Sequence, residues 1–160
     1  MPKPVDVTTP SDREIRVVRV FDAPARLAWD CHTQPDLLRR WMLGPPGWSM
    51  PVCEVDLTVG GAYRHRWRSD ADGTEFGSGG TYLEIVPFEK IVTTESMEGF
   101  SGEAVNTLLF EEAGGQTTVT LTMRFVSKEA RDGALQSGMS DGMAMGYDRM
   151  DELLAELAAA

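Results

Sequence analysis

The stretch AYRHRWR, residues 62–68, holds the side chains best suited to chemistry. Alternate side chains of a strand point to opposite faces, so Tyr63, His65 and Trp67 would share one face. A histidine among apolar neighbours can orient a bound ligand, or act as a general acid or base. A core histidine satisfied by one hydrogen bond is the plainer interpretation. His65 is therefore a candidate binding residue, and a weaker catalytic candidate.

The remaining metal-binding and nucleophilic residue types are Cys31, His32 and Cys53. They show no CxxC spacing, and with His65 they do not complete a zinc set. Adjacent helical residues point about 100° apart, which makes Cys31 and His32 a poor catalytic pair. The chain also lacks a P-loop and a dinucleotide-binding glycine motif. We expect structural thiols, no metal and no cofactor.

The charges of the chain argue against two classes of partner. Its net charge of −10 repels phosphate backbones and anionic lipid surfaces on average. The local exception is Arg64, Arg66 and Arg68, which we interpret as a solvated strand face that pairs with acidic strands. We expect neither a nucleic-acid nor a membrane partner. Acids on expected strands, such as Glu84 and Glu95, would form an enzyme site only if they converged, and convergence is not visible in a sequence.

A Pro/Gly-rich loop lies between large apolar side chains. Trp41, Met42 and Trp48 flank the sequence GPPG at residues 44–47. Such side chains can form a lid or a lip for a partner. They can equally close the open end of a sheet, and both interpretations remain.

A long amphipathic helix is expected from about Ser127 to Leu157, with Ser127 as its N-cap. At 100° per residue one stripe collects the apolar residues Leu135, Met139, Met143, Gly146, Met150, Leu153 and Leu157, with Tyr147 at its edge. The acidic side chains fall on the opposite face, and Met145 should point toward solvent.

The middle of this helix has an unusual composition. Gly138, Gly142 and Gly146 recur every four residues, and each costs about 1 kcal/mol of helix propensity relative to alanine. A close neighbour or open space would explain them. Methionine fills irregular gaps and suits partners of variable shape. The stripe is therefore either the wall of a cavity or a gap-filled core.

The order of the other elements is readable from hydrophobic alternation and turn residues. Residues 1–12 suggest a flexible tail, 13–21 a strand, and two short helices follow before residue 44. Hairpin signals such as Asp72-Gly73 then separate a series of strands. The last strand, at residues 116–126, turns four apolar residues inward: Val119, Leu121, Met123 and Phe125. The 160-residue length suits one domain, and no signal peptide or membrane span is seen, so we expect a cytoplasmic protein.

Together these features resemble the START-like (SRPBCC) helix-grip superfamily, in the branch related to the C-terminal domain of the activator of Hsp90 ATPase. The resemblance spans residues 13–157 and rests on Arg19-x-Phe21 with Ala23-Pro24, Trp29, Thr33-x-Pro35 with Leu37 and Leu38, Trp41-Met42-x-Gly44-Pro45, Asp56 with Gly60-Gly61, Asp72-Gly73, and Gly80-x-Tyr82-x-Glu84-Ile85-x-Pro87. Two tryptophans are frequent in the family where this chain has Trp41-Met42. The additional N-terminal domain of the eukaryotic co-chaperones has no counterpart here, which weakens a carry-over of chaperone activation.

The resemblance implies an α+β helix-grip (START/Bet v 1-like) fold, with a curved antiparallel sheet around a long C-terminal helix. It would form one domain over residues 13–160. We expect a small lipophilic molecule to bind between sheet and helix without catalysis, lined by Trp41, Met42, Trp48, Tyr63, His65, Trp67, Leu121, Met123, Met139, Met143, Tyr147 and Met150. The alternatives are a module that stimulates an Hsp90-type chaperone, and a cyclase-like or lyase-like enzyme that uses His65. The chain would act as a monomer or a homodimer.

Overall fold

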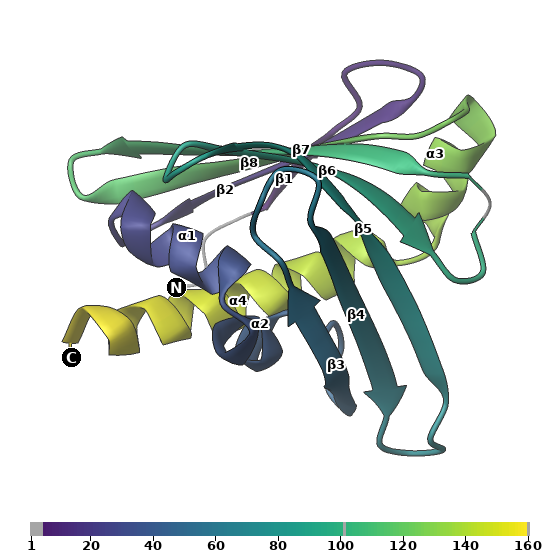
Figure 1. The fold of residues 1–160 in the computed structure, drawn as a ribbon, viewed down its shortest axis with the longest axis horizontal. Helices are drawn as coiled ribbons and strands as arrows, with labels where there is room; N and C mark the ends of the chain where they lie inside the picture. Colours follow the sequence, from purple (N-terminus) through teal and green to yellow (C-terminus); the bar gives the residue numbers. More distant parts are fainter. Residues whose placement is uncertain (1–4, 101, 160) are drawn as a thin grey trace.

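The computed structural model describes residues 5–100 and 102–159. They form one eight-stranded antiparallel sheet in the order β1-β2-β8-β7-β6-β5-β4-β3, with four helices (Figure 1). The strands are β1 Asp6–Thr8, β2 Glu14–Phe21, β3 Trp48–Val55, β4 Ala62–Ser69, β5 Glu75–Val86, β6 Lys90–Met97, β7 Ala104–Ala113 and β8 Gln116–Arg124. The helices are α1 Ala25–Thr33, α2 Pro35–Trp41, α3 Lys128–Gln136 and α4 Met139–Ala159.

The sheet is strongly curved, and the helices lie on its concave side. In Figure 1, β3 to β5 bend away from the plane of β2, β7 and β8, and α4 crosses the hollow that this bend creates. The pairing register shifts once in β3, between Ser49 and Val52, and once in β5, between Tyr82 and Glu84. Such irregularities bend a strand and increase its twist. The expected α+β helix-grip fold is thus confirmed.

Strand β2 follows the alternation read from the sequence, with Ile15, Val17 and Phe21 almost completely buried. Strand β1 pairs with β2 through Val7 opposite Val17 and was not expected, since residues 1–12 suggested a tail. A three-residue strand is too short to show a hydrophobic period and forms only where a neighbour offers a free edge. Residues 1–4 of the expected tail lie outside the described residues.

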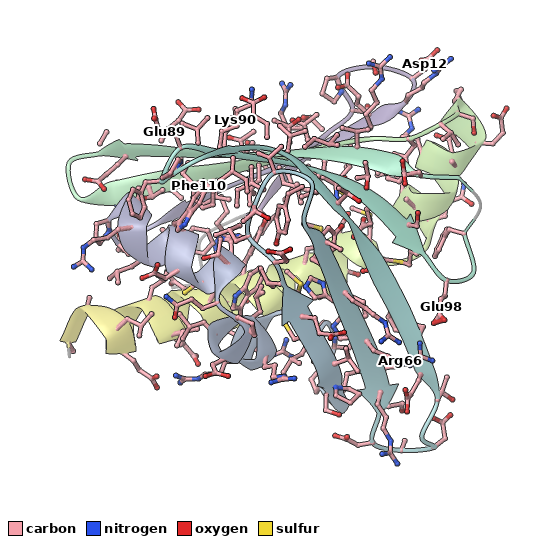
Figure 2. The ribbon with its side chains drawn as sticks, in the orientation of Figure 1. Asp12, Arg66, Glu89, Lys90, Glu98 and Phe110 are labelled. Atoms are coloured by element: carbon pink, nitrogen blue, oxygen red, sulfur yellow. The ribbon has the colours of Figure 1, made fainter. Side chains whose placement is uncertain are left out.

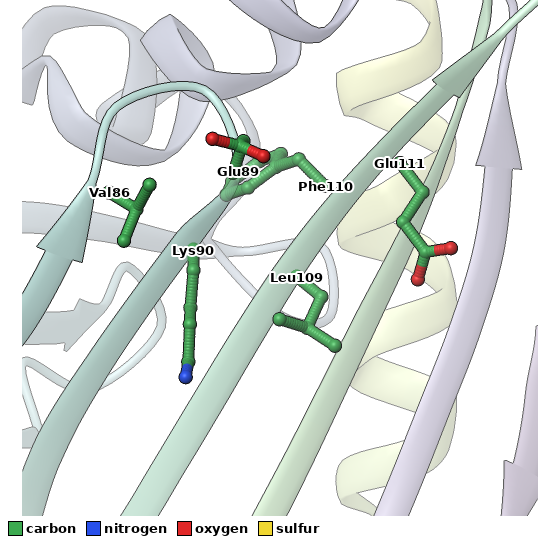
Figure 3. Close-up of a pocket in the computed structure, with 6 residues that line it drawn as sticks. All are labelled: Val86, Glu89, Lys90, Leu109, Phe110 and Glu111. Atoms are coloured by element: carbon green, nitrogen blue, oxygen red, sulfur yellow. The ribbon is translucent and has the colours of Figure 1, made fainter.

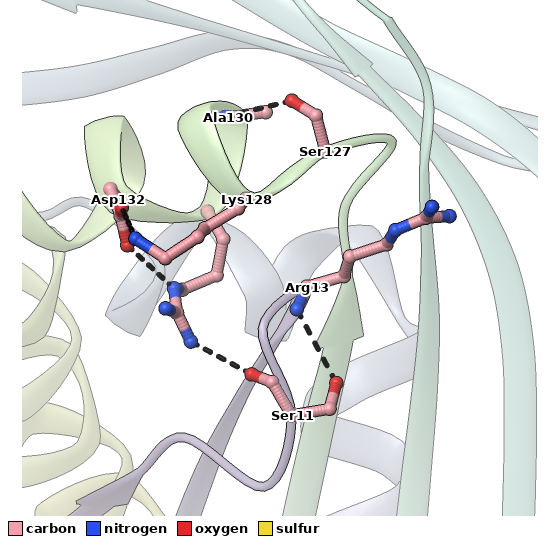
Figure 4. Close-up of polar contacts among 7 residues, drawn as sticks. Ser11, Arg13, Ser127, Lys128, Ala130 and Asp132 are labelled. Atoms are coloured by element: carbon pink, nitrogen blue, oxygen red, sulfur yellow. Dashed lines mark hydrogen bonds and ion pairs between the residues drawn. The ribbon is translucent and has the colours of Figure 1, made fainter.

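The single helix expected over residues 127–157 is wrong, because the chain breaks into α3 and α4. Ser127 does cap α3, and its Oγ accepts a hydrogen bond from the backbone N–H of Ala130 at 3.1 Å (Figure 4). The break lies at Gly138, whose φ of +83° belongs to the left-handed region that glycine adopts without strain. The hydroxyl of Ser137 also donates to the carbonyl of Ala134 at the end of α3.

The other two glycines of the series face the end of α2 and the loop that follows it. A Cβ added to Gly146 would lie 3.0 Å from the carbonyl oxygen of Trp41, at the end of α2. One added to Gly142 would lie 3.8 Å from the Cα of Gly44, in the loop after α2. A close neighbour therefore explains Gly146, whereas the contacts at Gly142 would accommodate a Cβ.

A buried arginine connects α4 to the sheet. Arg19 of β2 is 1% exposed, and its Nη1 donates to Oδ1 of Asp148 at 2.9 Å. The helix periodicity placed Asp148 on the solvent face, and its side chain is indeed 48% exposed. Asp148 thus bridges from the helix surface to a cation inside the protein, a contact that no helical period encodes.

Candidate functional site

The aromatic row of β4 lies on one face of the strand, as its alternation predicted, and this face is turned toward the helices. Tyr63, His65 and Trp67 are buried. The indole N–H of Trp67 donates to the carbonyl of Met42, directly after α2, at 2.7 Å. We refer to this concave, helix-facing side of the sheet as the inner face.

His65 is buried without a complete set of hydrogen bonds. It lies between the rings of Tyr63 and Trp67, with centroids 5.2 and 5.7 Å away. Burial lowers the pKa of His65 to about 4, so the imidazole is neutral near pH 7. Its Nε2 is inaccessible to solvent and has no hydrogen-bond partner among the described residues. Such an atom carries a desolvation penalty that a bound group could relieve.

Ser78 lies directly opposite His65 on the neighbouring strand β5. It is 6% exposed, and its Oγ likewise has no partner among the described residues. Sequence reasoning missed Ser78, because the surrounding run GSGG carries no hydrophobic alternation. The only available signal was its register with His65, which the sequence alone does not give.

Two further polar side chains continue this series on β6 and β7. Asn106 Nδ2 donates weakly to Oε1 of Glu95 at 3.4 Å, while the buried Oδ1 of Asn106 has no partner among the described residues. Burial raises the pKa of Glu95, and the hydrogen bond from Asn106 partly offsets that rise. Burial and the nearby Glu95 raise the pKa of Tyr63 as well. We call His65, Ser78, Glu95 and Asn106, from four consecutive strands, the polar cluster.

The middle of the inner face is packed less completely than its surroundings. Five inward side chains of β6, β7 and β8 keep part of their surface accessible, and we call them the inner patch: Thr93, Glu95, Asn106, Leu108 and Leu121. The register pairs Asn106 with Thr93 and Leu108 with Leu121, so these residues are contiguous. Around them on the same face lie buried residues, namely Ile15, Val17, Tyr82, Ile91, Phe110, Val119 and Met123.

Next to this patch, a group of aromatic rings in mutual contact covers the inner face. We call this group the aromatic end: Trp29, His32, Trp41, Phe110 and Tyr147. The ring of Trp41 stacks on that of Tyr147 at 5.8 Å, and its N–H donates to the carbonyl of Cys31 at 2.8 Å. His32 contacts Trp41 at 5.1 Å and Phe110 at 5.2 Å. Trp41 and Tyr147 are therefore built into the core.

The other candidate residues divide between core and surroundings. Met150 is completely buried and Met123 is 7% exposed. Met42, Leu121, Met139 and Met143 are partly buried and pack against the core. Trp48 contacts Phe76 at 5.5 Å, and Phe76 stacks on Trp67 at 5.1 Å. The two tryptophans around the GPPG loop thus occupy different environments, with Trp41 in the aromatic end and Trp48 at the start of β3.

Neither of two surface hollows involves the candidate residues. One, of about 360 Å³, is lined by residues of β5, β6 and β7 and the β5–β6 turn: Val86, Glu89, Lys90, Leu109, Phe110 and Glu111 (Figure 3). The other, of about 460 Å³, lies at Ser11, Asp12, Arg13, Glu14 and Arg124. Figure 4 shows the β1–β2 turn beside it, where Arg131 of α3 donates to the carbonyl of Ser11 at 2.8 Å.

The thiols and the outer arginines behave as structural features. Cys31 and Cys53 are free and buried, and burial raises the pKa of Cys31 to about 12. In the part of the chain that the structure describes, no three metal-binding side chains come together and no helix could span a membrane. Arg66 forms ion pairs with Glu75 at 2.6 Å and Glu98 at 2.9 Å, as expected for a solvated face (Figure 2).

Comparison with known proteins gives a consistent picture. A family model described as activator of Hsp90 ATPase homolog 1-like protein matches residues 22–155. A solved structure from Rhodobacter sphaeroides is 26% identical, with a TM-score of 0.90 over 96% of this chain and 99% of that one. A protein of Arthrobacter aurescens is 25% identical, with a TM-score of 0.81 over 96% and 91% of the two chains. An AHSA1-like protein of Aeromonas hydrophila, 18% identical over 86% and 93% of the chains with a TM-score of 0.70, shares the fold. No curated protein matches significantly.

Proposed function

The chain belongs to the activator of Hsp90 ATPase homolog 1-like family, and on that premise we propose that it binds a small, largely apolar molecule between the inner face and α4. The proposed role is binding without catalysis, in the cytoplasm. The observation that carries it is the inner patch. Apolar side chains such as Leu108 and Leu121 remain partly accessible there, although buried residues surround them.

Physical chemistry favours an apolar occupant at this place. Each Å² of apolar surface removed from water contributes about 25 cal/mol, so covering the accessible parts of Leu108 and Leu121 supplies a driving force for binding. The partly buried Met139 and Met143 of α4 pack against the same core. Their flexible side chains can adapt to the shape of a ligand.

The test is a titration with decanol, a neutral amphiphile, followed by thermal unfolding and calorimetry. We expect saturable binding and a rise in melting temperature for the wild type, because a ligand that binds only the folded state stabilises it. Leu121→Trp fills the inner patch and should abolish the effect. Val105→Trp adds the same side chain at a 38% exposed position of β7 and serves as the control. Unsaturable binding, or equal binding by Leu121→Trp, would contradict the proposal.

A second candidate is a chaperone partner, and the family description favours it. If it holds, the chain co-purifies with an Hsp90 homologue and raises its ATPase rate. An unchanged rate at saturating protein dismisses it. Catalysis by His65 has weaker support, since a pKa of about 4 leaves little imidazolium to donate a proton at neutral pH. For that candidate, His65→Ala should abolish turnover and retain binding.

A further inference from the structure

We propose that the bound molecule carries a hydrogen-bond donor, an amine or an alcohol, at the end that reaches the polar cluster. This inference rests on the proposed function, since it specifies the chemistry of the same ligand. It goes further because an apolar site alone would not distinguish an amine from a carboxylate. The polar cluster would make that distinction, and it excludes fatty-acid-like ligands.

The first argument is the unmatched hydrogen-bonding capacity of the cluster. His65 is 9% exposed and Ser78 is 6% exposed, so both are at least nine-tenths buried. His65 Nε2, Ser78 Oγ and Asn106 Oδ1 are buried without partners among the described residues. Buried polar atoms in native proteins normally have partners, and three unpaired ones on β4, β5 and β7 of the same face indicate a site for a polar group.

The second argument is the direction of the missing hydrogen bonds. The Asn106 Oδ1 atom can accept hydrogen bonds but cannot donate them, and the same holds for an ionised Glu95 carboxylate. Neutral His65 offers one acceptor nitrogen, and the hydroxyl of Ser78 can accept as well as donate. Acceptors therefore outnumber donors in the cluster. A ligand group that donates hydrogen bonds matches it better than one that only accepts.

The third argument is charge. Among the described residues, Glu95 forms no ion pair, and its hydrogen bond is with the neutral Asn106. The negative charges of Glu95 and of the exposed Glu103, which precedes β7, both raise the pKa of the Tyr63 hydroxyl, so the region around that hydroxyl has a negative potential. A carboxylate ligand would be repelled there. An ammonium group would provide the counter-charge that a buried carboxylate lacks.

The register places this cluster beside the apolar part of the inner patch. Asn106 lies opposite Met123, and two residues further along the same strands Leu108 lies opposite Leu121. An elongated molecule can therefore lay its chain over the two leucines and direct its polar end toward Glu95 and Asn106. The polar and apolar requirements meet in one ligand.

The experiment compares decylamine, decanol and decanoate, three probes with the same chain, by calorimetry below their aggregation concentrations. We expect the wild type to bind decylamine about tenfold or more tightly than decanoate, because hydrogen bonds between charged groups are roughly twice as strong as those between neutral ones. The affinity for decanol should lie between those for decylamine and decanoate, or equal that for decylamine if Glu95 is protonated. Glu95→Gln should remove the preference for the amine and improve decanoate binding. Glu54→Gln, at an exposed acid paired with Arg64, is the matched control and should change nothing.

The outcomes separate this inference from the proposed function. If decanoate binds as tightly as decylamine, the inference fails while apolar binding stands. A preference for the amine that survives Glu95→Gln also overturns it. If none of the three probes binds saturably, the proposed function itself fails. The wild-type ranking is decisive even if a variant does not fold.

Discussion

The inner face has two parts that use the same kinds of residue in opposite ways. At the aromatic end, the Trp41 N–H donates to the carbonyl of Cys31 and His32 Nδ1 donates to that of Ala28, whereas His32 Nε2 is buried without a partner among the described residues. In the polar cluster, His65, Ser78 and Asn106 each keep a buried atom without a partner among the described residues. The contacts of His32 and Trp41 with neighbouring rings, together with these two hydrogen bonds to backbone carbonyls, indicate a region selected for stability. The polar cluster, with its unmatched polar atoms beside accessible leucines, indicates a region that is not optimised for stability alone.

The two histidines express this contrast most directly. Burial lowers the pKa of both His32 and His65 to about 4. His32 Nδ1 donates to the carbonyl of Ala28 at 2.7 Å, which fixes its tautomer and holds it against Trp41. His65 has no such backbone contact in the described residues. Similar pKa values thus arise at a structural site and at a candidate binding site, so a perturbed pKa alone does not identify function.

The largest expected effect is the loss of stability when the aromatic end is opened. Trp41→Ala removes a ring that is 5% exposed, together with its hydrogen bond, and should lower the free energy of unfolding by about 3–5 kcal/mol. Trp48→Ala, at the partly exposed tryptophan, is the control and should cost far less. Urea unfolding measures both. Equal losses would show that the two tryptophans have equivalent roles and would remove the basis of the comparison.

The next effect is the dependence of stability on pH. A folded-state pKa of about 4 lies below the ordinary value of 6.5, so the stabilising contribution is present above pH 6.5 and is lost as the pH falls toward 4. Each histidine should account for a loss of about 2 kcal/mol between pH 7 and pH 5. The two histidines together should account for a loss of about 4 kcal/mol. His32→Gln and His65→Gln should each reduce this combined loss by about half, as measured by urea unfolding at the two pH values.

Ligand binding should then separate the two histidines. Decylamine should shift the imidazole NMR signals of His65 and leave those of His32 unchanged. A shift at His32 alone would place the ligand in the aromatic end and contradict the assignment of roles.

A smaller effect is expected from the glycines that pack α4 against α2. Gly146→Ala places its Cβ 3.0 Å from the carbonyl oxygen of Trp41 and should destabilise the protein by about 1–2 kcal/mol despite the gain in helix propensity. Gly142→Ala meets only ordinary contacts at 3.8 and 3.9 Å and should be neutral, or stabilising by up to about 1 kcal/mol. Thermal unfolding of the two variants gives the comparison. If both variants change the stability in the same direction, the close approach of Gly146 to Trp41 does not determine the effect of an added Cβ.

The smallest effect concerns single hydroxyl groups. Thr117 Oγ1 is buried and donates to the carbonyl of Ala23 at 2.7 Å, so Thr117→Val should cost about 1–2 kcal/mol. Ser78→Ala removes a hydroxyl that has no partner among the described residues and should leave stability nearly unchanged. The difference between their unfolding free energies reports whether the polar cluster contributes to folding. A large loss for Ser78→Ala would assign it a structural role.

Much of the fold was predictable because it follows from contacts that are local in the chain. Alternation predicted a strand over residues 13–21, where β2 lies with Ile15 and Val17 buried, and placed Tyr63, His65 and Trp67 on one side of β4. The N-cap at Ser127 and the 40% exposure of Met145 also agree with the local pattern. The candidate site was less accessible to such reasoning. Ser78 and Asn106 are unremarkable in sequence and gain their significance only from strand pairing.

The sequence by itself determined which residues of β4 and β8 share a face and where α3 begins, because side-chain direction repeats with the backbone period and Ser127 is a local N-cap signal. Only the tertiary structure decided that Gly138 ends one helix, that Gly142 and Gly146 meet the end of α2, and that Arg19 reaches Asp148. These outcomes depend on the register and curvature of the whole sheet, which bring together residues more than a hundred positions apart. A periodic pattern carries no information about such distances.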